Sequence, residues 1–293
     1  MIKKSILFLS ILLFLTSCSK DSDERLKIST STWIGYAPLF YAKEKGWLKE
    51  LNIKLINVSS LSENLYLYKA GNSDAYTGTQ YECNELKNHI PSLKPIILFD
   101  RSDGGDIILS NKTIQELQNT DKPINAYLEI DSINSDLLKY FINKHNLKDK
   151  NINYINKAQA EISSLRKKDM LSPTIIVTYV PYNYTLEKNG FQEIASTDDS
   201  LDLIVLDALF TTSEVLDKHQ HQFKELKKLI DKSVVILHNN PQEFYNVVKP
   251  YMLDMSYSEF LLALEDVLWI NKDVSSKLKE RMNDIGFPSR GLL

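Results

Sequence analysis

Cysteine and histidine are scarce in this chain. Its 293 residues include two cysteines, Cys18 and Cys83, and five histidines. Two thiols cannot build a disulfide framework or a thiolate metal site, so both are excluded. His219 and His221 are two positions apart in a charged segment that we expect to be helical, where they would point to different faces and could not share a metal ion. We therefore expect neither a metal site nor a cofactor.

The chain also lacks an excess of positive charge. It has 35 lysines and arginines against 38 aspartates and glutamates, which gives a net charge of −3. A mildly acidic surface argues against binding to nucleic acid. There is no internal repeat, low-complexity tract or proline-rich linker. A content of 43% hydrophobic and 25% charged residues is ordinary for a globular protein of one large or two modest domains.

One long apolar run is present, and it lies at the N-terminus. It extends from Ile6 to Leu15 behind two lysines, and it is too short to span a bilayer comfortably. The sequence Leu-Thr-Ser-Cys that ends at Cys18 resembles a bacterial lipobox. We expect residues 1–17 to be a lipoprotein signal peptide, Cys18 to carry the lipid, and residues 18–26 to be a tether in the periplasm or on the outer face of the cell membrane. A plain secretory peptide, in which Cys18 is incidental, is the alternative.

From residue 27 onward, short apolar strands alternate with amphipathic segments. This alternation predicts an α/β fold with helices on both faces of mostly parallel sheets. Ser/Thr-x-x-Glu patterns and Asn240-Pro241 mark several helix starts. The expected strands are 27–31, 53–58, 73–77, 95–100, 124–128, 151–155, 174–179, 191–196 and 201–206. The expected helices are 37–49, 60–71, 81–89, 113–118, 131–145, 158–168, 212–230, 241–252, 256–267 and 274–283.

The pattern of apolar residues is interrupted at two adjacent glycines, Gly104 and Gly105. We interpret this break as a crossing between two lobes, with a second crossing near residue 200. Lobe 1 is then discontinuous and comprises residues 27–102 and 203–293, whereas lobe 2 comprises residues 103–202. A pair of connections of this kind behaves as a hinge.

The stretch from residue 31 to 39 has the features of a pocket floor. Gly35 permits a tight turn after the first strand, and Pro38 lies where a helix can start without losing an amide hydrogen bond. Two aromatic residues, Trp33 and Tyr36, are left at the turn. They could contact a ligand, or they could simply pack under the first helix.

Other strand-to-helix turns supply further candidates, because ligands of α/β sheets bind beyond the carboxyl ends of strands, where helix N-termini present free amides. Ser60 has an alternative reading as a helix cap, and Asp106 as a turn former beside glycine. The predicted ligand-binding residues are Thr32, Trp33, Tyr36, Ser60, Thr79, Gln80, Asp106, Ser132, Asn134, Tyr179 and Tyr182.

Several short motifs, in this order, resemble the periplasmic solute-binding proteins of the nitrate, sulfonate, taurine and thiamine-precursor class. They are Trp33-x-Gly35-Tyr36-x-Pro38, Ala42-x-x-x-Gly46, Asp74-Ala75, Asp100-x-Ser102-x-Gly104-x-Asp106 and Pro181-Tyr182. The resemblance implies a two-lobed type II periplasmic-binding-protein fold, a monomer that closes on a small molecule in a cleft between its lobes and delivers it to the permease and ATPase subunits of an ABC importer. The family commonly has Trp-Glu-Pro where this chain has Val180-Pro181 after Tyr179, so an acidic contact is missing here.

The charged residues near the predicted turns indicate the charge of the groups on the ligand. Arg101 is the only cation close to them, whereas four acids lie near: Glu82, Asp103, Asp106 and Glu129. A simple oxyanion such as nitrate or sulfate would not use these acids. An amine-bearing zwitterion such as taurine, or an aromatic amine such as a thiamine pyrimidine precursor, fits the acids and the aromatic residues better.

Two other functions remain open at this point. A lipid-anchored sensor subunit that reports a ligand to a membrane receptor would have the same sequence features. A pyrimidine-synthase-like enzyme would share the fold. However, none of the five histidines lies in the predicted turns and no activated nucleophile is visible, so we do not expect an enzyme.

Overall fold

The computed structural model describes residues 24–198, 203–270, 274–288 and 290–293. The predicted signal peptide and the lipidation residue Cys18 lie outside these ranges. Within them, no helix combines the length and the apolar character that a membrane crossing requires.

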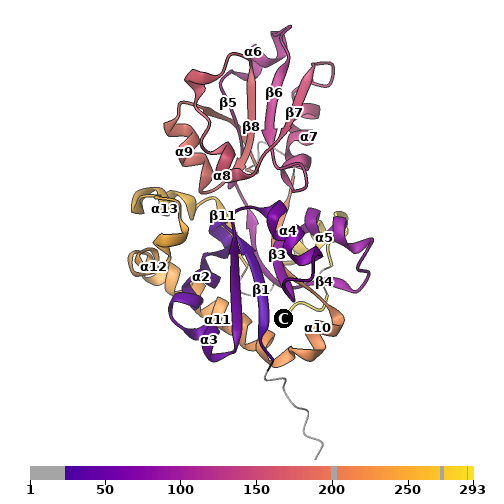
Figure 1. The fold of residues 1–293 in the computed structure, drawn as a ribbon, viewed down its shortest axis with the longest axis vertical. Coiled ribbons are helices and arrows are strands. Elements are labelled where there is room, and N and C mark those ends of the chain that lie inside the picture. The colour runs from indigo at the N-terminus through magenta and orange to yellow at the C-terminus, as the bar shows by residue number, and fades with distance from the viewer. Residues whose placement is uncertain (1–23, 199–202, 271–273, 289) are drawn as a thin grey trace, which may run out of the picture.

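The first sheet has six strands and forms the lower lobe in Figure 1. Its strand order is β11-β4-β10-β3-β1-β2. The strands are β1 (Leu26–Ser31), β2 (Ile53–Val58), β3 (Ala75–Thr79), β4 (Leu93–Ser102), β10 (Val205–Thr212) and β11 (Val267–Trp269). The late strand β10 therefore lies inside the sheet, between two strands from the first third of the chain.

Helices cover both faces of this sheet, because its central strands carry apolar side chains on both sides. In β4, Phe99 belongs to the core under one set of helices and Leu98 to the core under the other. The first set is η1 (Ile34–Tyr36), α2 (Ala37–Glu44), α3 (Trp47–Glu50), α11 (Gln220–Asn239), α12 (Pro241–Val248), η3 (Lys249–Tyr251) and α13 (Tyr257–Ala263). The second set is α4 (Leu61–Lys69), α5 (Gln80–Lys87) and α14 (Ser276–Asp284). The short helix α10 (Ser213–Lys218) follows β10, and its Leu216 belongs to the first core.

The second sheet has five strands and forms the upper lobe in Figure 1. Its order is β7-β6-β8-β5-β9. The strands are β5 (Asp106–Ser110), β6 (Ile124–Leu128), β7 (Ile152–Asn156), β8 (Thr174–Tyr179) and β9 (Gln192–Ser196). The helices of this lobe are α6 (Ile114–Asn119), α7 (Asn134–Lys144), α8 (Gln159–Ile162), η2 (Lys167–Asp169) and α9 (Tyr182–Lys188).

The α/β fold class with two lobes is confirmed, but the sheets are mixed rather than mostly parallel. In the first sheet β1 pairs in parallel with β2 and β3, whereas β10 is antiparallel to both β3 and β4. In the second, β6 is parallel to β7 and β8, whereas β5 is antiparallel to β8 and β9. Each of these four antiparallel pairs includes β5 or β10, the strands that follow the two crossings.

Several elements differ from the sequence prediction in extent. The helix expected over 158–168 ends at Ile162, since extended backbone at Arg166 interrupts it. The helix expected over 212–230 is broken at His219 into α10 and α11, and α11 continues to Asn239. The strand expected over 201–206 is β10, over Val205–Thr212. The helix expected over 256–267 stops at Ala263, and the residues after it form β11 along β4.

The chain passes from the first sheet to the second after Ser102 and returns before Val205. A hydrogen-bonded cluster joins the two passages: Ser102 and Thr197 share a hydrogen bond of 2.7 Å between their hydroxyls, and the amide of Gly104 donates to Thr197 Oγ1 at 3.2 Å. The division into lobe 1 (27–102 and 203–293) and lobe 2 (103–202) remains our proposal for the moving parts.

Candidate functional site

The turns at the carboxyl ends of β1, β2 and β3 face those at the ends of β6 and β8 across the gap between the sheets. Hydrogen bonds connect them directly. The Tyr182 hydroxyl donates to the Ser59 carbonyl at 2.6 Å, and the Ile133 amide donates to Glu82 Oε1 at 3.0 Å. The amide of Ser62 approaches Glu129 Oε2 at 3.4 Å. The two lobes are therefore in contact, in a closed arrangement.

Strand register explains why three polar residues meet on the lobe 1 side. Asp207 of β10 is opposite Thr79 of β3 on one side and opposite Asp100 of β4 on the other. Two aspartates directly opposite each other in a sheet repel, and this arrangement is destabilising in the absence of a compensating partner. On the lobe 2 side, Asp106 of β5 is opposite Tyr179 of β8.

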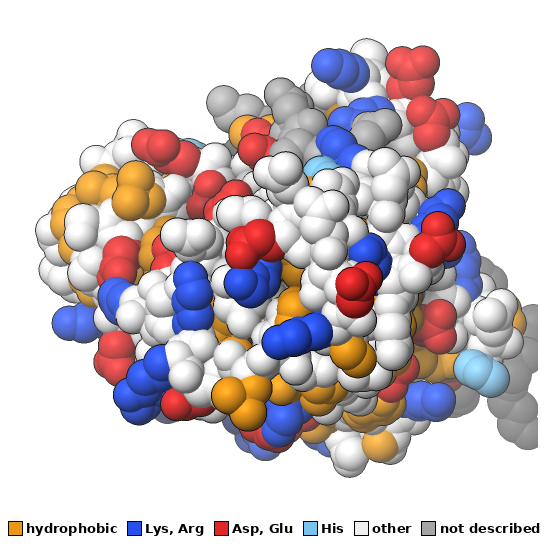
Figure 2. Space-filling view, turned by 90° about the horizontal axis from the view of Figure 1, so that it is seen from above, with side chains coloured by type: hydrophobic (Ala, Val, Ile, Leu, Met, Phe, Trp, Pro, Cys, Tyr) orange, Lys and Arg blue, Asp and Glu red, His pale blue; other side chains and the backbone are white. Residues whose placement is uncertain are grey.

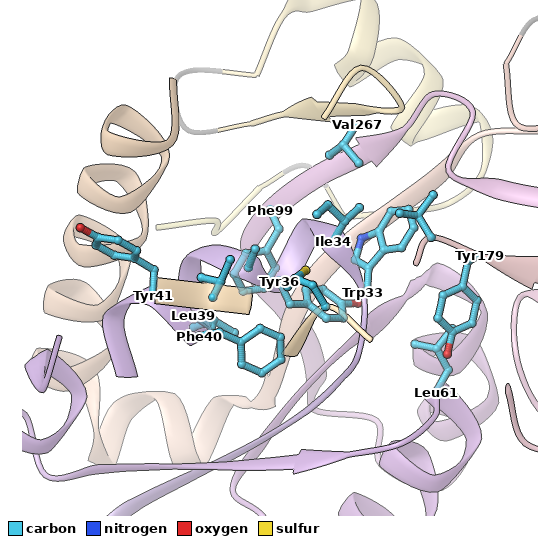
Figure 3. Packing of buried hydrophobic residues seen from close by; sticks show 14 of the residues in the cluster. Trp33, Ile34, Tyr36, Leu39, Phe40, Tyr41, Leu61, Phe99, Tyr179 and Val267 are labelled. Carbon is cyan, nitrogen blue, oxygen red and sulfur yellow. The ribbon is translucent and has the colours of Figure 1, made fainter. Parts of the chain in front are cut away.

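Trp33 lies between the two lobes. Its side chain is 4% exposed, and its indole Nε1–H donates to Asp100 Oδ1 over 3.3 Å. The indole meets the ring of Tyr179 edge-on, with 6.1 Å between ring centroids, and Figure 3 shows Tyr179 and Leu61 beside it.

Tyr36 lies deeper in lobe 1 than Trp33. Its hydroxyl donates to Asp207 Oδ1 at 2.5 Å, and its ring packs edge-on against Phe99 at 5.4 Å. Both alternatives from the sequence thus apply: Tyr36 is part of the core, and its polar end also holds a carboxylate of the site.

Five carboxylates are buried in this region. Asp100, Asp106, Asp207, Glu82 and Glu129 are each between 0 and 5% exposed. Over the described part of the chain, no lysine or arginine is buried. On the face that Figure 2 shows, charged side chains of both signs are interspersed, whereas the buried charged groups among the described residues are all acids.

Burial raises the pKa of every one of these acids. The pKa of Asp106 and that of Glu129 each rise to about 7, mainly through loss of hydration, with a contribution from the charge of Glu82. The pKa values of Asp100 and Asp207 lie well above their usual range because both groups are buried, and the charge of Asp100 adds to the effect on Asp207. The site therefore favours neutral carboxyl groups or a positively charged partner.

Glu82 and Glu129 use their oxygens on backbone amides. Glu82 accepts from Thr79 N at 2.7 Å in a capping box at the start of α5, and it also accepts the Ile133 amide from the other lobe. Glu129 accepts from Gln159 N at 2.9 Å in its own lobe. The amides of Thr79, Ile133 and Gln159 are thus bound to the protein's own carboxylates and are not free to bind an anion.

Two polar atoms that face this region have no hydrogen-bond partner among the described residues. They are Oδ2 of Asp100 and the hydroxyl of Tyr179, and both side chains are buried. Unsatisfied buried polar groups are costly, and they are typical of binding sites.

A small cavity remains at the centre, with a volume of ≈ 10 Å³. It is lined by Trp33, Leu61, Thr79, Asp106, Tyr179 and Asp207. Four of these six belong to the predicted set. None of the five histidines lines it.

The remaining predicted residues have other contacts. Ser60 caps α4 by accepting from Glu63 N at 3.2 Å. Gln80 binds β10, where its side chain donates to Ile204 O at 2.6 Å and accepts from Leu206 N at 3.0 Å.

Thr32 is buried and its side chain contributes a hydrogen bond to the Tyr182 hydroxyl. In lobe 2, Ser132 donates to Glu129 O at 2.9 Å and to Asn134 Oδ1 at 3.3 Å. These two residues are buried beside Glu129 and do not line the cavity.

Sequence reasoning missed Leu61, Asp100 and Asp207 as site residues. Asp100 stood in a quoted motif without being chosen. Asp207 had a usable signal, because an acid inside the apolar run Val205–Phe210 is rare unless it is paired or functional.

Comparisons with known proteins match this chain in fold but not in sequence. Neither protein-family models nor curated protein sequences match this chain. Solved structures do. The ligand-binding component of an ABC-type import system from Staphylococcus aureus, with zinc bound, is 14% identical with a TM-score of 0.70, over 90% of this chain and 91% of that one.

Two further structures have the same architecture. The periplasmic aliphatic sulphonate binding protein SsuA from Escherichia coli is 13% identical, with a TM-score of 0.67 over 90% of this chain and 85% of its own. A Candida albicans gene product, described as exhibiting the generic periplasmic binding protein structural fold, is 13% identical, with a TM-score of 0.62 over 89% of this chain and 95% of its own. This chain has the periplasmic-binding-protein fold.

Proposed function

We propose that this protein is an extracytoplasmic, lipid-anchored solute-binding protein that captures a small amine-bearing molecule and delivers it to the permease and ATPase of an ABC importer. The observation that carries the proposal is the set of five buried carboxylates where the two lobes meet, without a buried lysine or arginine in the described chain to neutralise them. The fold, and the binding proteins of import systems that share it, support the same reading.

The charge of the site selects the ligand class. An oxyanion would meet carboxylates of its own sign, and three backbone amides close to the site already bind Glu82 and Glu129. A cationic amine would meet Asp100, Asp106 and Asp207 and would restore the charge balance. Both a taurine-like zwitterion and a thiamine-pyrimidine-like amine carry such a group. The aromatic ring of Tyr179, which lines the cavity, favours the aromatic amine.

Closure is the step that would make binding useful to a transporter. The contacts of Tyr182 with Ser59 and of Ile133 with Glu82 exist only when the lobes meet. A ligand that bridges acids of both lobes, such as Asp106 from lobe 2 and Asp207 from lobe 1, adds stability to the closed arrangement and not to the open one. The permease then meets a surface made of both lobes.

Calorimetric titration of the full chain, purified in detergent, tests the ligand class. The panel contains taurine, a thiamine pyrimidine precursor, nitrate and sulfate. We expect an amine to bind, and Asp207→Asn to weaken that binding at least tenfold. Asp231→Asn is the matched control, because this surface aspartate pairs with Lys227 within α11, away from the cleft. Tight binding of nitrate or sulfate alone would show the proposal to be wrong.

Membrane attachment has a separate test. If Cys18 carries the lipid, Cys18→Ala should move the protein from the membrane fraction to the soluble fraction of the cell envelope. Attachment that persists in this variant would contradict the lipoprotein part of the proposal.

A further inference from the structure

The cavity that Trp33, Asp106 and Asp207 line between the lobes is too small for a solute. A cavity of ≈ 10 Å³ admits about one water molecule. Yet its surroundings include acids that lack a counter-charge and two buried polar atoms without a partner in the described chain. A solute can be held at this place only if one of the side chains around the cavity moves away.

Of the three aromatic side chains here that make a hydrogen bond through a side-chain donor, Trp33 has the longest bond. Tyr36 and Tyr182 are tied by hydrogen bonds of 2.5 and 2.6 Å. Trp33 has a single hydrogen bond of 3.3 Å to Asp100, which is long for an N–H···O contact. It precedes the short helix η1 with extended backbone and makes no capping bond.

Two glycines shape a narrow slot around the indole of Trp33. A Cβ atom added at Gly35 would lie 2.2 Å from Nε1, and one added at Gly105 would lie 2.4 Å from Cη2 at the far end of the ring. Gly35 belongs to lobe 1 and Gly105 to the crossing between the lobes. The indole thus fits between these two residues only because neither has a side chain, and a ring that took its place would use the same space.

The indole reaches only one of the two oxygens of Asp100. Its one N–H reaches Oδ1, while Oδ2 of the same buried carboxylate has no partner among the residues described. A ring edge with two adjacent N–H donors would reach both oxygens. Paired, charge-assisted hydrogen bonds of that kind are among the strongest in proteins.

We infer that the indole of Trp33 holds the place of the ligand in this closed arrangement, and that the ligand is a planar ring with an amidine-type edge, as in a protonated aminopyrimidine. The ligand displaces the indole and donates to both oxygens of Asp100. This inference rests on the proposed function, because it names the ligand class for the same site.

Benzamidine is a suitable probe, since it is a flat ring with an amidinium edge. The full chain with Trp47→Phe and Trp269→Phe retains Trp33 as its single tryptophan. We expect saturating benzamidine to shift the emission of Trp33 to longer wavelength as the indole enters water. Benzamide has the same shape with one amino donor group and no charge, and it should bind at least tenfold more weakly.

Substitutions of Trp33 test whether the ligand displaces the indole or only contacts it. Trp33→Ala should bind benzamidine at least tenfold more tightly than the unchanged chain, because the competing side chain is gone, and it should also bind added indole. If Trp33→Ala does not fold, Trp33→Phe keeps a ring in the slot but loses the bond to Asp100, and the same direction is expected. Asp100→Asn should abolish the preference for benzamidine over benzamide. Trp47→Ala, whose indole lies under Lys232 on the outer side of lobe 1, is the control and should leave the affinity unchanged.

The outcomes distinguish this inference from the proposed function. Benzamidine binding with unchanged Trp33 emission, or weaker binding by Trp33→Ala, would overturn the displacement. Binding of taurine or the non-planar diamine putrescine, with no binding of benzamidine, would overturn the planar ligand class and leave the solute-binding function standing. No binding of any amine would overturn both.

Discussion

Gly105→Ala tests the packing of Trp33 against the crossing between the lobes. Gly105 is not among the glycines with positive φ, so the backbone tolerates alanine there. The new methyl group would lie 2.4 Å from Cη2 and 3.1 Å from Cζ3 of Trp33. Carbon atoms in contact are normally about 3.5 to 4.0 Å apart, so either the ring or the crossing must shift by about 1 Å. Overpacking of this kind costs about 1 to 3 kcal/mol.

The same substitution made together with Trp33→Ala gives the decisive comparison. With the indole removed, the nearest remaining atom of those that surround Gly105 is the carbonyl oxygen of Asp266, at 3.3 Å, so the cost of Gly105→Ala should nearly vanish. A double-mutant cycle should then give a coupling of about 1 to 3 kcal/mol. Urea unfolding of the four proteins measures it.

The control for this cycle is Gly71→Ala. Gly71→Ala is strained by a φ of 74° but has no atom within 4 Å of the new methyl group, so its cost should be equal with and without Trp33. If Gly105→Ala costs the same in both backgrounds, the indole does not fill the slot and the reasoning about Trp33 is wrong.

Three further predictions follow from buried groups. The native pKa of about 7 for Asp106 and for Glu129 exceeds the usual 3.8 and 4.5, so the native protein binds more protons between these values. Its unfolding free energy should fall as pH rises from about 4.5 to 7, by at most on the order of 3 kcal/mol per group, and a rise in urea titrations over that range would contradict this. Glu82→Ala leaves the Ile133 amide unpaired and should enlarge the radius of gyration of the ligand-bound protein in solution scattering; an unchanged radius would remove Glu82 from the closure contacts. Phe244→Ala, at a fully buried position of lobe 1, should cost about 3 to 5 kcal/mol in thermal unfolding while the amine affinity of the folded protein stays the same.

Local signals made most of the fold predictable. The pattern at Thr113 is a capping box in the structure, and Ser60 caps α4 by accepting from the amide of Glu63, so each starts a helix at the next residue. Pro241 is the first residue of α12. Signals of this kind depend on neighbouring residues alone, and a single sequence therefore contains them.

Long-range pairing was not predictable in the same way. Asp207 and Asp100 are opposite each other because β10 is antiparallel to β4 with one particular register. The two strands are about a hundred residues apart in the chain, and neither sequence alone specifies that register. The aromatic residue Tyr182 was chosen as a ligand contact, yet its hydroxyl reaches across to Ser59. Which of several buried aromatic residues faces a cleft depends on how the two lobes meet, and the pattern of either lobe alone does not determine it.

The position of β10 has a consequence for how the chain folds. The strands of lobe 2 lie within one continuous segment, Asp106–Ser196, so that lobe can form as soon as this segment is available. The sheet of lobe 1 must wait for Val205–Thr212 to insert between β3 and β4, which until then expose unpaired edges. Contacts of such long sequence separation form slowly. During that interval, those edges are open to pairing with other chains.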